Sequence, residues 1–201
     1  MNTKIVRVLV MGIVGILAFA GSAAAQMDTW QNDAAHSGAY FQVRHLLVSN
    51  IRGSFHKMTV TVQYDSKNVA KTSIDATIDA TSIDTDVVPR DEDLRGPNYF
   101  DVAKFPTLTF KSKRVDSAGA GKMKLVGDLT IHGVTKEVTF DVDGPTAAVE
   151  DARKATHMGA TATTKINRKD FGITINPVVG DDVSIIMELD LIKKAAPAGS
   201  N

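Results

Sequence analysis

This sequence has no cysteine, one tryptophan and six prolines among its 201 residues, and its positive and negative charges cancel at 23 each. Without cysteine, the chain has no disulfide scaffold, no thiolate metal site and no thiol nucleophile. Without net charge or a basic stripe, it lacks the surface with which nucleic-acid binders neutralise phosphates. A chain of this length can bury enough surface to be stable as one domain. These absences favour a globular protein held together by its hydrophobic core.

The first 25 residues differ from the rest of the chain. Lys4 and Arg7 precede an apolar run of 13 residues (8–20), and small residues continue to Ala25. This order is typical of a secretory signal peptide, and the run is shorter than the roughly 20 residues that cross a membrane. We expect cleavage after Ala25 and a bacterial periplasmic protein. Residues 26–201 keep 21 basic and 23 acidic side chains, a net charge of −2.

Alternation of apolar and polar residues predicts strands through most of residues 26–201, because successive side chains of a strand point to opposite faces. Eight segments alternate in this way: 41–45, 58–64, 74–81, 108–113, 123–131, 138–143, 158–166 and 183–191. Between two of them, His132-Gly133 is a strong signal for a hairpin turn. Residues 91–99 predict one short helical connector, and residues 147–154 have a weaker helical tendency.

Eight strands with short turns predict an all-β protein, either a sandwich or a closed antiparallel barrel. We favour the barrel because closure removes exposed strand edges. The barrel domain spans residues 26–201, with residues 192–201 as a flexible tail. Several positions expected to face inward are small, which indicates space for a ligand unless large side chains opposite fill it: Ala76, Ala80, Gly127, Ala160 and Ala162.

No set of residues predicts catalysis. There is no G-x-S-x-G elbow, G-x-G-x-x-G loop or P-loop, so we expect no enzyme, no catalytic residue and no nucleotide cofactor. The five histidines lack the close spacing of common zinc sites. An alternative is a metal-dependent enzyme that uses His36, His45 and His56. Absence of a catalytic set favours a binding protein, and we expect no metal.

Four ordered blocks between Trp30 and Leu191 resemble the motifs of the YceI-like family. They are Asp33–Ser37 with Phe41–His45 and Gly53–Phe55; Arg90, Asp91, Leu94, Tyr99–Asp101, Phe105, Pro106 and Phe110–Ser112; Gly127–Lys136; and Asn167–Gly172. Two departures are Tyr99, where phenylalanine is usual, and Glu137, where proline is common. Tyr99 leaves the preferred head group of a ligand open, because it adds a hydroxyl.

The resemblance implies an eight-stranded, lipocalin-like antiparallel barrel in the periplasm, as a monomer or homodimer. It implies a long-chain isoprenoid lipid, such as an isoprenoid quinone or polyprenyl compound, bound in the interior without catalysis. It also implies a cytochrome b561-type membrane protein as a partner, for which the chain would be an accessory module.

On this basis, predicted tunnel-wall residues are those with large side chains on the inward faces and in the central connector. They are Phe41, Val43, His45, Phe55, Ile78, Tyr99, Phe100, Phe110, Leu125, Leu129 and Phe171. His45 shares a face with Phe41 and Val43 and is placed to meet a polar head group. Arg90 and Asp91 are expected to form an ion pair that holds the helical connector.

Overall fold

The structure is a computed structural model that describes residues 27–195, so the predicted signal peptide and its cleavage site lie outside the described residues. The strands are β1 (Asp28–Asn32), β2 (Gly38–His45), β3 (Ser49–Phe55), β4 (Met58–Tyr64), β5 (Ser73–Asp79), β6 (Ile83–Asp84), β7 (Thr107–Ser117), β8 (Lys122–Ile131), β9 (Val134–Asp143), β10 (Val149–Glu150), β11 (Thr156–Asn167) and β12 (Val179–Lys193). The helical elements are α1 (Val88–Arg95) and the 3-10 turns η1 (Val69–Lys71), η2 (Ala80–Ser82) and η3 (Arg168–Phe171).

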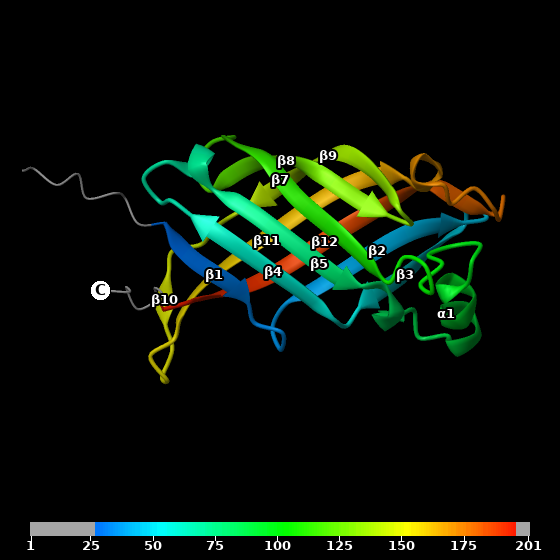
Figure 1. Cartoon of the computed structure of the whole chain (residues 1–201), viewed down its shortest axis with the longest axis horizontal. Coiled ribbons are helices and arrows are strands. Elements are labelled where there is room, and N and C mark those ends of the chain that lie inside the picture. The colour runs from blue at the N-terminus through cyan, green and yellow to red at the C-terminus, as the bar shows by residue number, and fades with distance from the viewer. Residues whose placement is uncertain (1–26, 196–201) are drawn as a thin grey trace, which may run out of the picture.

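These strands close into the predicted eight-stranded antiparallel barrel (Figure 1). Pairing runs β11-β9-β8-β7-β5-β4-β1-β12 and returns from β12 to β11 along eleven residue pairs. The seam between β9 and β11 is short, with only residues 141–143 paired to 161–163. Closure leaves the barrel no free edge within this ring, which the alternating pattern alone does not guarantee.

Three walls of the barrel consist of interrupted strands. β1 and β2 pair with the same edge of β12, and residues 33–37 form the break between them. The next wall consists of β4, which pairs with β1, and β3, which pairs with β2. The third wall consists of β5, which pairs with β4, and β6, which pairs with β3. The extra strands therefore lengthen the barrel at the end that carries α1 and add no new wall.

The two ends of the barrel differ in what they carry (Figure 1). We call the end with α1, the β2–β3 turn and the loop between η3 and β12 the helix end. The opposite end holds β10 and both ends of the described chain, and we call it the terminal end.

Some sequence predictions need correction. The helix begins at Val88 and ends at Arg95, earlier than the predicted 91–99, because Gly96-Pro97 stops it. The helical tendency of 147–154 is wrong: the segment forms β10 and a turn. The flexible tail is wrong for its first two residues, because β12 continues to Lys193 and pairs there with β1.

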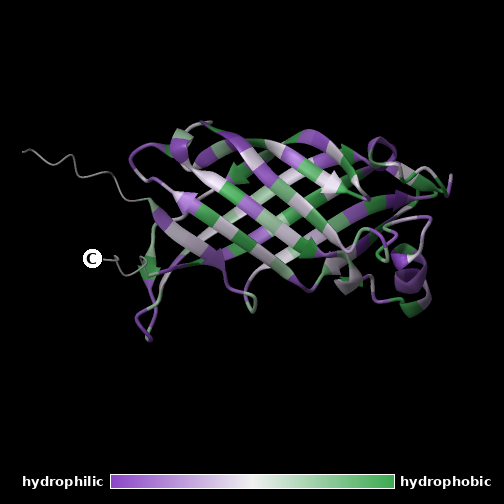
Figure 2. Ribbon diagram, in the orientation of Figure 1, coloured by the Kyte–Doolittle hydropathy of each residue, from purple (hydrophilic) through white to green (hydrophobic). Residues whose placement is uncertain are grey.

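Hydrophobic side chains alternate with polar ones along each wall (Figure 2). The inward set forms one large buried cluster through the helix end and the middle, which includes Ile83, Phe140 and Phe171. A smaller cluster around Trp30 and Val60 fills part of the terminal end. Each large apolar side chain that is fully buried contributes about 1.5–3 kcal/mol. Met58, Ile74 and Ala76 pack against both clusters, so the two cores meet inside the barrel.

Candidate functional site

The helix end is covered by α1 and the connector that follows it. Asp91 is buried, and one oxygen of its carboxylate accepts hydrogen bonds from the Thr85 amide (2.9 Å) and hydroxyl (2.5 Å). Arg90 donates to the same hydroxyl (2.7 Å) and to the Thr85 carbonyl (2.8 Å). The predicted ion pair between Arg90 and Asp91 is therefore wrong, because both side chains bind Thr85 instead. Arg95 adds a hydrogen bond to the Ile83 carbonyl (2.6 Å), which ties the helix to β6.

Behind this cover lies an apolar cavity of about 160 Å³, which we call the helix-end cavity. Seven predicted tunnel-wall residues border it: Phe41, Val43, Phe55, Tyr99, Phe100, Leu129 and Phe171. Three aromatic rings form a chain along one side, with centroids 5.9 Å apart from Phe41 to Phe55 and 5.7 Å apart from Phe55 to Phe100. Contact of these residues with a ligand remains a prediction.

A second apolar cavity of about 70 Å³ lies toward the terminal end, and we call it the terminal cavity. The predicted wall residue Leu125 borders it, as do the small residues Ala160 and Ala162. The sequence indicated space at small inward positions, and at these two alanines the structure has it. At Gly127 a large side chain fills the space instead, because the ring of Phe110 occupies the position where a Cβ atom would point.

Phe110 lies between the two cavities. On β7, Leu108 borders the helix-end cavity and Val115 borders the terminal cavity, with Phe110 between them and bordering neither. Its ring packs edge-on against Phe140, with centroids 5.3 Å apart. This pair divides one apolar interior into two chambers.

Two other predicted wall residues lie elsewhere. Ile78 is half-buried and packs against the large cluster without bordering either cavity. His45 ends β2, where it pairs with Val179, and its half-exposed side chain borders neither cavity. The reason is position along the strand: Phe41 and Val43 lie inside the barrel, and two residues later the strand has reached its rim.

The sequence did not single out several other wall residues of the helix-end cavity, such as Leu108, Phe140 and Met187, and the charged one among them is Arg168. It borders the helix-end cavity and is only 6% exposed. Its guanidinium donates to the backbone carbonyls of residues 173, 175, 176, 179 and 180 at 2.6–3.1 Å, and it lies 3.3 Å from the Asp181 carboxylate. The side chain thus fixes the whole loop between η3 and β12. The Asn167–Gly172 motif was the available signal, but its spacing alone does not indicate burial.

Tyr99 joins the same loop to the cover. Its hydroxyl accepts a hydrogen bond from the Asn176 side chain (3.1 Å). The hydroxyl that distinguishes this chain from the usual phenylalanine therefore has a partner at the edge of an otherwise apolar cavity.

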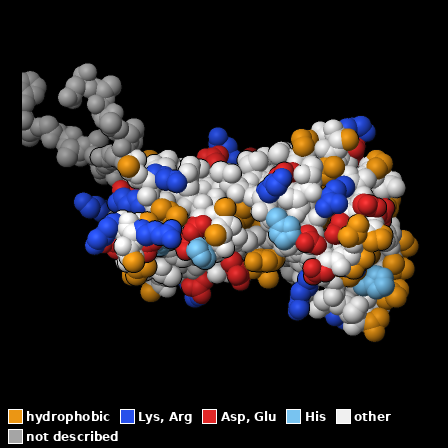
Figure 3. Space-filling model, turned by 90° about the horizontal axis from the view of Figure 1, so that it is seen from below, with side chains coloured by type: hydrophobic (Ala, Val, Ile, Leu, Met, Phe, Trp, Pro, Cys, Tyr) orange, Lys and Arg blue, Asp and Glu red, His pale blue; other side chains and the backbone are white. Residues whose placement is uncertain are grey.

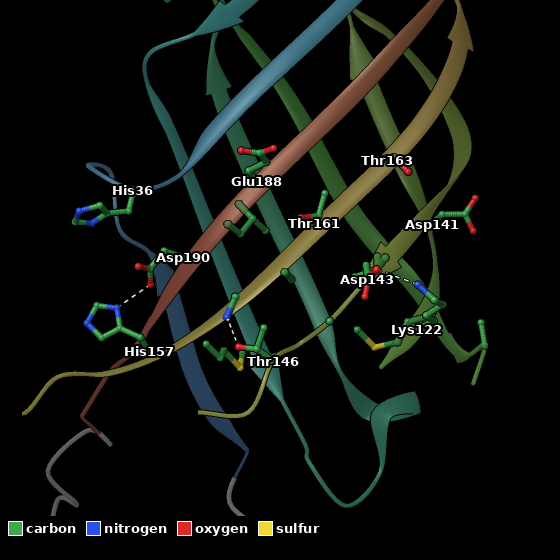
Figure 4. Close-up of a pocket in the computed structure, with 18 of the residues that line it drawn as sticks. His36, Lys122, Asp141, Asp143, Thr146, His157, Thr161, Thr163, Glu188 and Asp190 are labelled. Carbon is green, nitrogen blue, oxygen red and sulfur yellow. Dashed lines mark hydrogen bonds and ion pairs between the residues drawn. The ribbon is translucent and has the colours of Figure 1, made fainter. Parts of the chain in front are cut away.

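A larger hollow of about 1,020 Å³ opens on the outer surface near β10 (Figure 4). Its walls come largely from β9, β11 and β12, and most of its charged groups have an ion-pair partner. Lys122 lies 2.9 Å from Asp143, and His157 Nδ1 lies 2.8 Å from Asp190 (Figure 4). The hydrogen bond to Asp190 raises the pKa of His157 above its usual range. This hollow, which we call the groove, therefore mixes charged and apolar groups, unlike the almost wholly apolar lining of the two cavities.

The histidines of the alternative metal site are not brought together. Among the described residues, one group of histidine and carboxylate side chains is close enough to share an ion: Asp33, His36 and Asp190. The ring of His56 instead lies 2.8 Å from the Asp84 carboxylate. His45 belongs neither to the group around His36 nor to this pair. A site made from His36, His45 and His56 is therefore wrong, because they lie in a strand break, at a strand end and in another break.

His36 has a structural role in its strand break. Its ring lies 2.8 Å from the Asp33 carboxylate, and this hydrogen bond lowers the pKa of Asp33. The Asp33 amide donates to the Asp190 carbonyl (2.8 Å), and Ser37 exchanges hydrogen bonds with the backbone of Asp190. These hydrogen bonds hold residues 33–37, the segment between β1 and β2, against β12.

Comparison with known proteins places this fold in a family. The YceI-like domain matches residues 30–191. A Vibrio parahaemolyticus UPF0312 protein is 35% identical over 157 residues, which is 78% of this chain and 81% of the relative. Within residues 27–195, no helix has the length and hydrophobicity needed to cross a membrane.

Solved structures are similar over most of the barrel. Burkholderia cenocepacia BcnA aligns with a TM-score of 0.69 and 25% identity, covering 79% of this chain and 98% of BcnA. A structure described as a polyisoprenoid binding domain from Saccharophagus degradans aligns with a TM-score of 0.63 and 15% identity, covering 84% and 99%. The second likeness shows the fold alone. With its family motifs, barrel topology and relatives in agreement, the chain belongs to the YceI-like family.

Proposed function

We propose that this protein binds a long-chain isoprenoid lipid, of the isoprenoid quinone or polyprenyl type, inside its barrel as a non-catalytic carrier or store in the bacterial periplasm. The observation that carries the proposal is the pair of stacked apolar cavities in a closed barrel. A structural neighbour described as a polyisoprenoid binding domain supports the choice of ligand class. A cytochrome b561-type partner remains a prediction from the family resemblance.

The size of the cavities sets a condition on binding. Pockets for small ligands usually enclose about 300–1,000 Å³, and the two cavities enclose about 160 and 70 Å³. A long chain must therefore displace side chains to enter, and Phe110 stands where the two chambers would join. Burial of apolar surface contributes about 25 cal/mol per Å². Affinity can thus rise with chain length without any catalytic or charged group.

The direct test is organic extraction of freshly purified protein followed by mass spectrometry. We expect an isoprenoid lipid at up to one molecule per chain. Empty preparations that also fail to take up prenyl quinones would contradict the proposal. Recovery of straight-chain lipids alone would retain the barrel as a lipid site and overturn the ligand class.

The Phe110 barrier gives a sharper test with a built-in reporter. Trp30 is the only tryptophan in the chain, and it packs with Val62, Met158 and Leu191, which border the terminal cavity. A long acyl chain brominated at its far end should quench Trp30 only if the chain passes Phe110. We expect Phe110→Ala to lower the probe concentration needed for quenching, at a stability cost of about 3–5 kcal/mol.

Ile83→Ala is the matched control, because Ile83 is fully buried but borders neither cavity. It should lose about 2–5 kcal/mol of stability without easier quenching of Trp30. Equal quenching curves for the two variants would mean that Phe110 does not separate the chambers.

A further inference from the structure

The helix end carries an unusual concentration of exposed apolar side chains. Leu46, Leu47 and Val48, in the β2–β3 turn, are 56%, 82% and 76% exposed. Ile175 and Val178, in the loop between η3 and β12, are exposed as well. Hydrophobic side chains gather at this end of the space-filling view (Figure 3). Contiguous exposed apolar groups of this kind mark interaction surfaces.

The two segments form one structural unit. The Leu46 amide donates to the Val178 carbonyl (2.7 Å), directly beyond the pairing of His45 with Val179. Leu46 and Leu47 both have positive φ angles, of 50° and 59°, in a tight turn. We call residues 45–51 and 171–180 together the tip.

The tip has no Lys, Arg, Asp or Glu. Charged residues lie next to the tip instead, and two of them donate hydrogen bonds to its backbone carbonyls. Arg44 donates to the Leu47 carbonyl (2.6 Å) and to the Asn50 side chain (3.2 Å). Arg168 binds the carbonyls of the second segment from inside. Since unsatisfied polar groups are what make burial in an apolar medium costly, this arrangement lowers the cost of moving the tip out of water.

The tip also adjoins the helix-end cavity. Ile173 and Val179 belong to the tip and border that cavity, and Arg168 borders the cavity while it holds the tip. Whatever molecule or surface covers the tip would therefore lie beside the wall of the helix-end cavity.

We propose that the tip inserts into the surface of a phospholipid bilayer, so that the helix end of the barrel faces the lipid from which its ligand is drawn. The idea that the ligand is drawn from the bilayer rests on the proposed function, whereas binding of the tip to vesicles does not depend on it. The exposed side chains are aliphatic, the tip has no charged residue, and it borders an apolar cavity, so insertion into a lipid surface would bury no unpaired charge and would place lipid beside the cavity wall.

The charges around the tip specify the kind of binding. Arg44 and Arg52 flank the first segment, while Asp181 and Asp182 follow the second. This mixture gives no strong attraction to anionic lipid, so insertion must depend on apolar burial. Binding should therefore persist at about 0.5 M salt, which screens exposed charges strongly.

The test is flotation of the whole protein with phosphatidylcholine vesicles, with and without phosphatidylglycerol. We expect the protein to float with both, and the double variant Leu47→Asp, Val48→Asp to bind about tenfold more weakly or worse, because two apolar side chains are lost from the contact. Val149→Asp is the matched control, since Val149 is 62% exposed at the terminal end. The control should float like the unchanged protein.

A second measurement tests the same point without a charge in the tip. Leu47→Trp adds an exposed indole to a chain whose own Trp30 is buried. Vesicles should shift its emission to shorter wavelength, relative to the same titration of the unchanged protein. Absence of flotation by the unchanged protein, equal flotation of the Asp variant, or an unshifted Trp spectrum would each overturn the proposal.

The outcomes separate this inference from the proposed function. If the protein yields an isoprenoid on extraction but does not bind vesicles, docking is wrong and the lipid site stands. If it binds vesicles through the tip but never contains or takes up lipid, the lipid site is wrong. Binding that appears only with phosphatidylglycerol and disappears in salt would show electrostatic adsorption and would also overturn insertion of the tip.

Discussion

The two ends of this barrel differ in where they place charge. At the helix end, Asp91 and Arg168 are buried and fix backbone segments through several hydrogen bonds each, while the outer surface of the tip is uncharged. At the terminal end, charged side chains lie outside in exposed pairs such as Lys122 with Asp143 and Lys154 with Glu150. Exposed pairs contribute about 0–1 kcal/mol, whereas loss of one partner of a buried pair costs about 3–5 kcal/mol. The terminal end has one buried carboxylate as well, Asp65, which accepts hydrogen bonds from the amides of Lys67 and Asn68. Of the two cavities, however, only the helix-end cavity has a charged side chain, Arg168, in its wall.

The largest effect should come from Arg168. Arg168→Met removes the donor for five loop carbonyls and the partner of Asp181. Because buried carbonyls left without a donor cost about 1–3 kcal/mol each, we expect a loss of at least about 3 kcal/mol in the free energy of unfolding, measured by urea denaturation. The loop between η3 and β12 should also lose protection from hydrogen exchange.

Lys169→Met is the control for Arg168, because Lys169 also contacts Asp181, at 2.8 Å, but from the exposed side. It should change stability by less than about 1 kcal/mol. Similar losses in the two variants would remove the distinction between the buried and the exposed charge.

A pair of glycines tests packing in the interior against packing in the groove. At Gly127, a Cβ atom would meet the Lys111 carbonyl and the Phe110 ring, so Gly127→Ala should cost about 1–3 kcal/mol. At Gly159, which borders the groove, the nearest atoms to a Cβ would be at 3.6 Å or more. Gly159→Ala should therefore be neutral or stabilising by up to about 1 kcal/mol. Thermal unfolding of both variants would decide, and a greater loss at Gly159 would contradict this view of the interior.

The smallest effect concerns the pH dependence of the terminal end. The hydrogen bond from His157 to Asp190 raises the histidine pKa above its ordinary value of 6.5. The bond therefore contributes stability that is fully present below the unfolded-state pKa and is lost as pH rises through the folded-state pKa. The difference in Tm between the unchanged protein and His157→Gln should shrink as pH increases through this window.

An NMR titration of His157 provides the control. Asp190→Asn removes the main cause of the shift and should return the His157 pKa toward its ordinary value. An unchanged midpoint in that variant would mean that Asp151, whose carboxylate lies 3.6 Å from the other ring nitrogen, is the more important partner.

Much of the fold could be predicted because a barrel wall has a simple period. Each of the eight predicted strands is present, since alternation records which side of the sheet faces the core. β1, β3, β6 and β10 were missed: β6 and β10 are two residues long and β1 is five, and Ser49, Asn50 and Gly53 interrupt the apolar pattern of β3. These strands owe their existence to neighbours, because β1 pairs with both β4 and β12.

The candidate site was predicted less completely than the fold. Alternation identified residues such as Phe41 and Leu129 as inward-facing, and they border the helix-end cavity. It could not separate Leu129 from Leu125, on the same face of β8, although they border different chambers. Period two records the face of a strand, while the level of a residue along the barrel depends on register and on ring packing such as that of Phe110 with Phe140.

The sequence by itself determined the class of the protein: an all-β chain without cysteine whose alternating strands and ordered motifs indicate a YceI-like barrel. Only the tertiary structure decided that Phe110 divides the interior, that Arg168 is a buried support for a loop, and that 45–51 and 171–180 form one uncharged tip. The physical reason is the sequence separation between the residues that make each contact. Strand periodicity arises between near neighbours in the chain, whereas Phe110 meets Phe140, 30 residues away, and the two segments of the tip are more than 100 residues apart. These contacts form only when the strands assemble into the barrel.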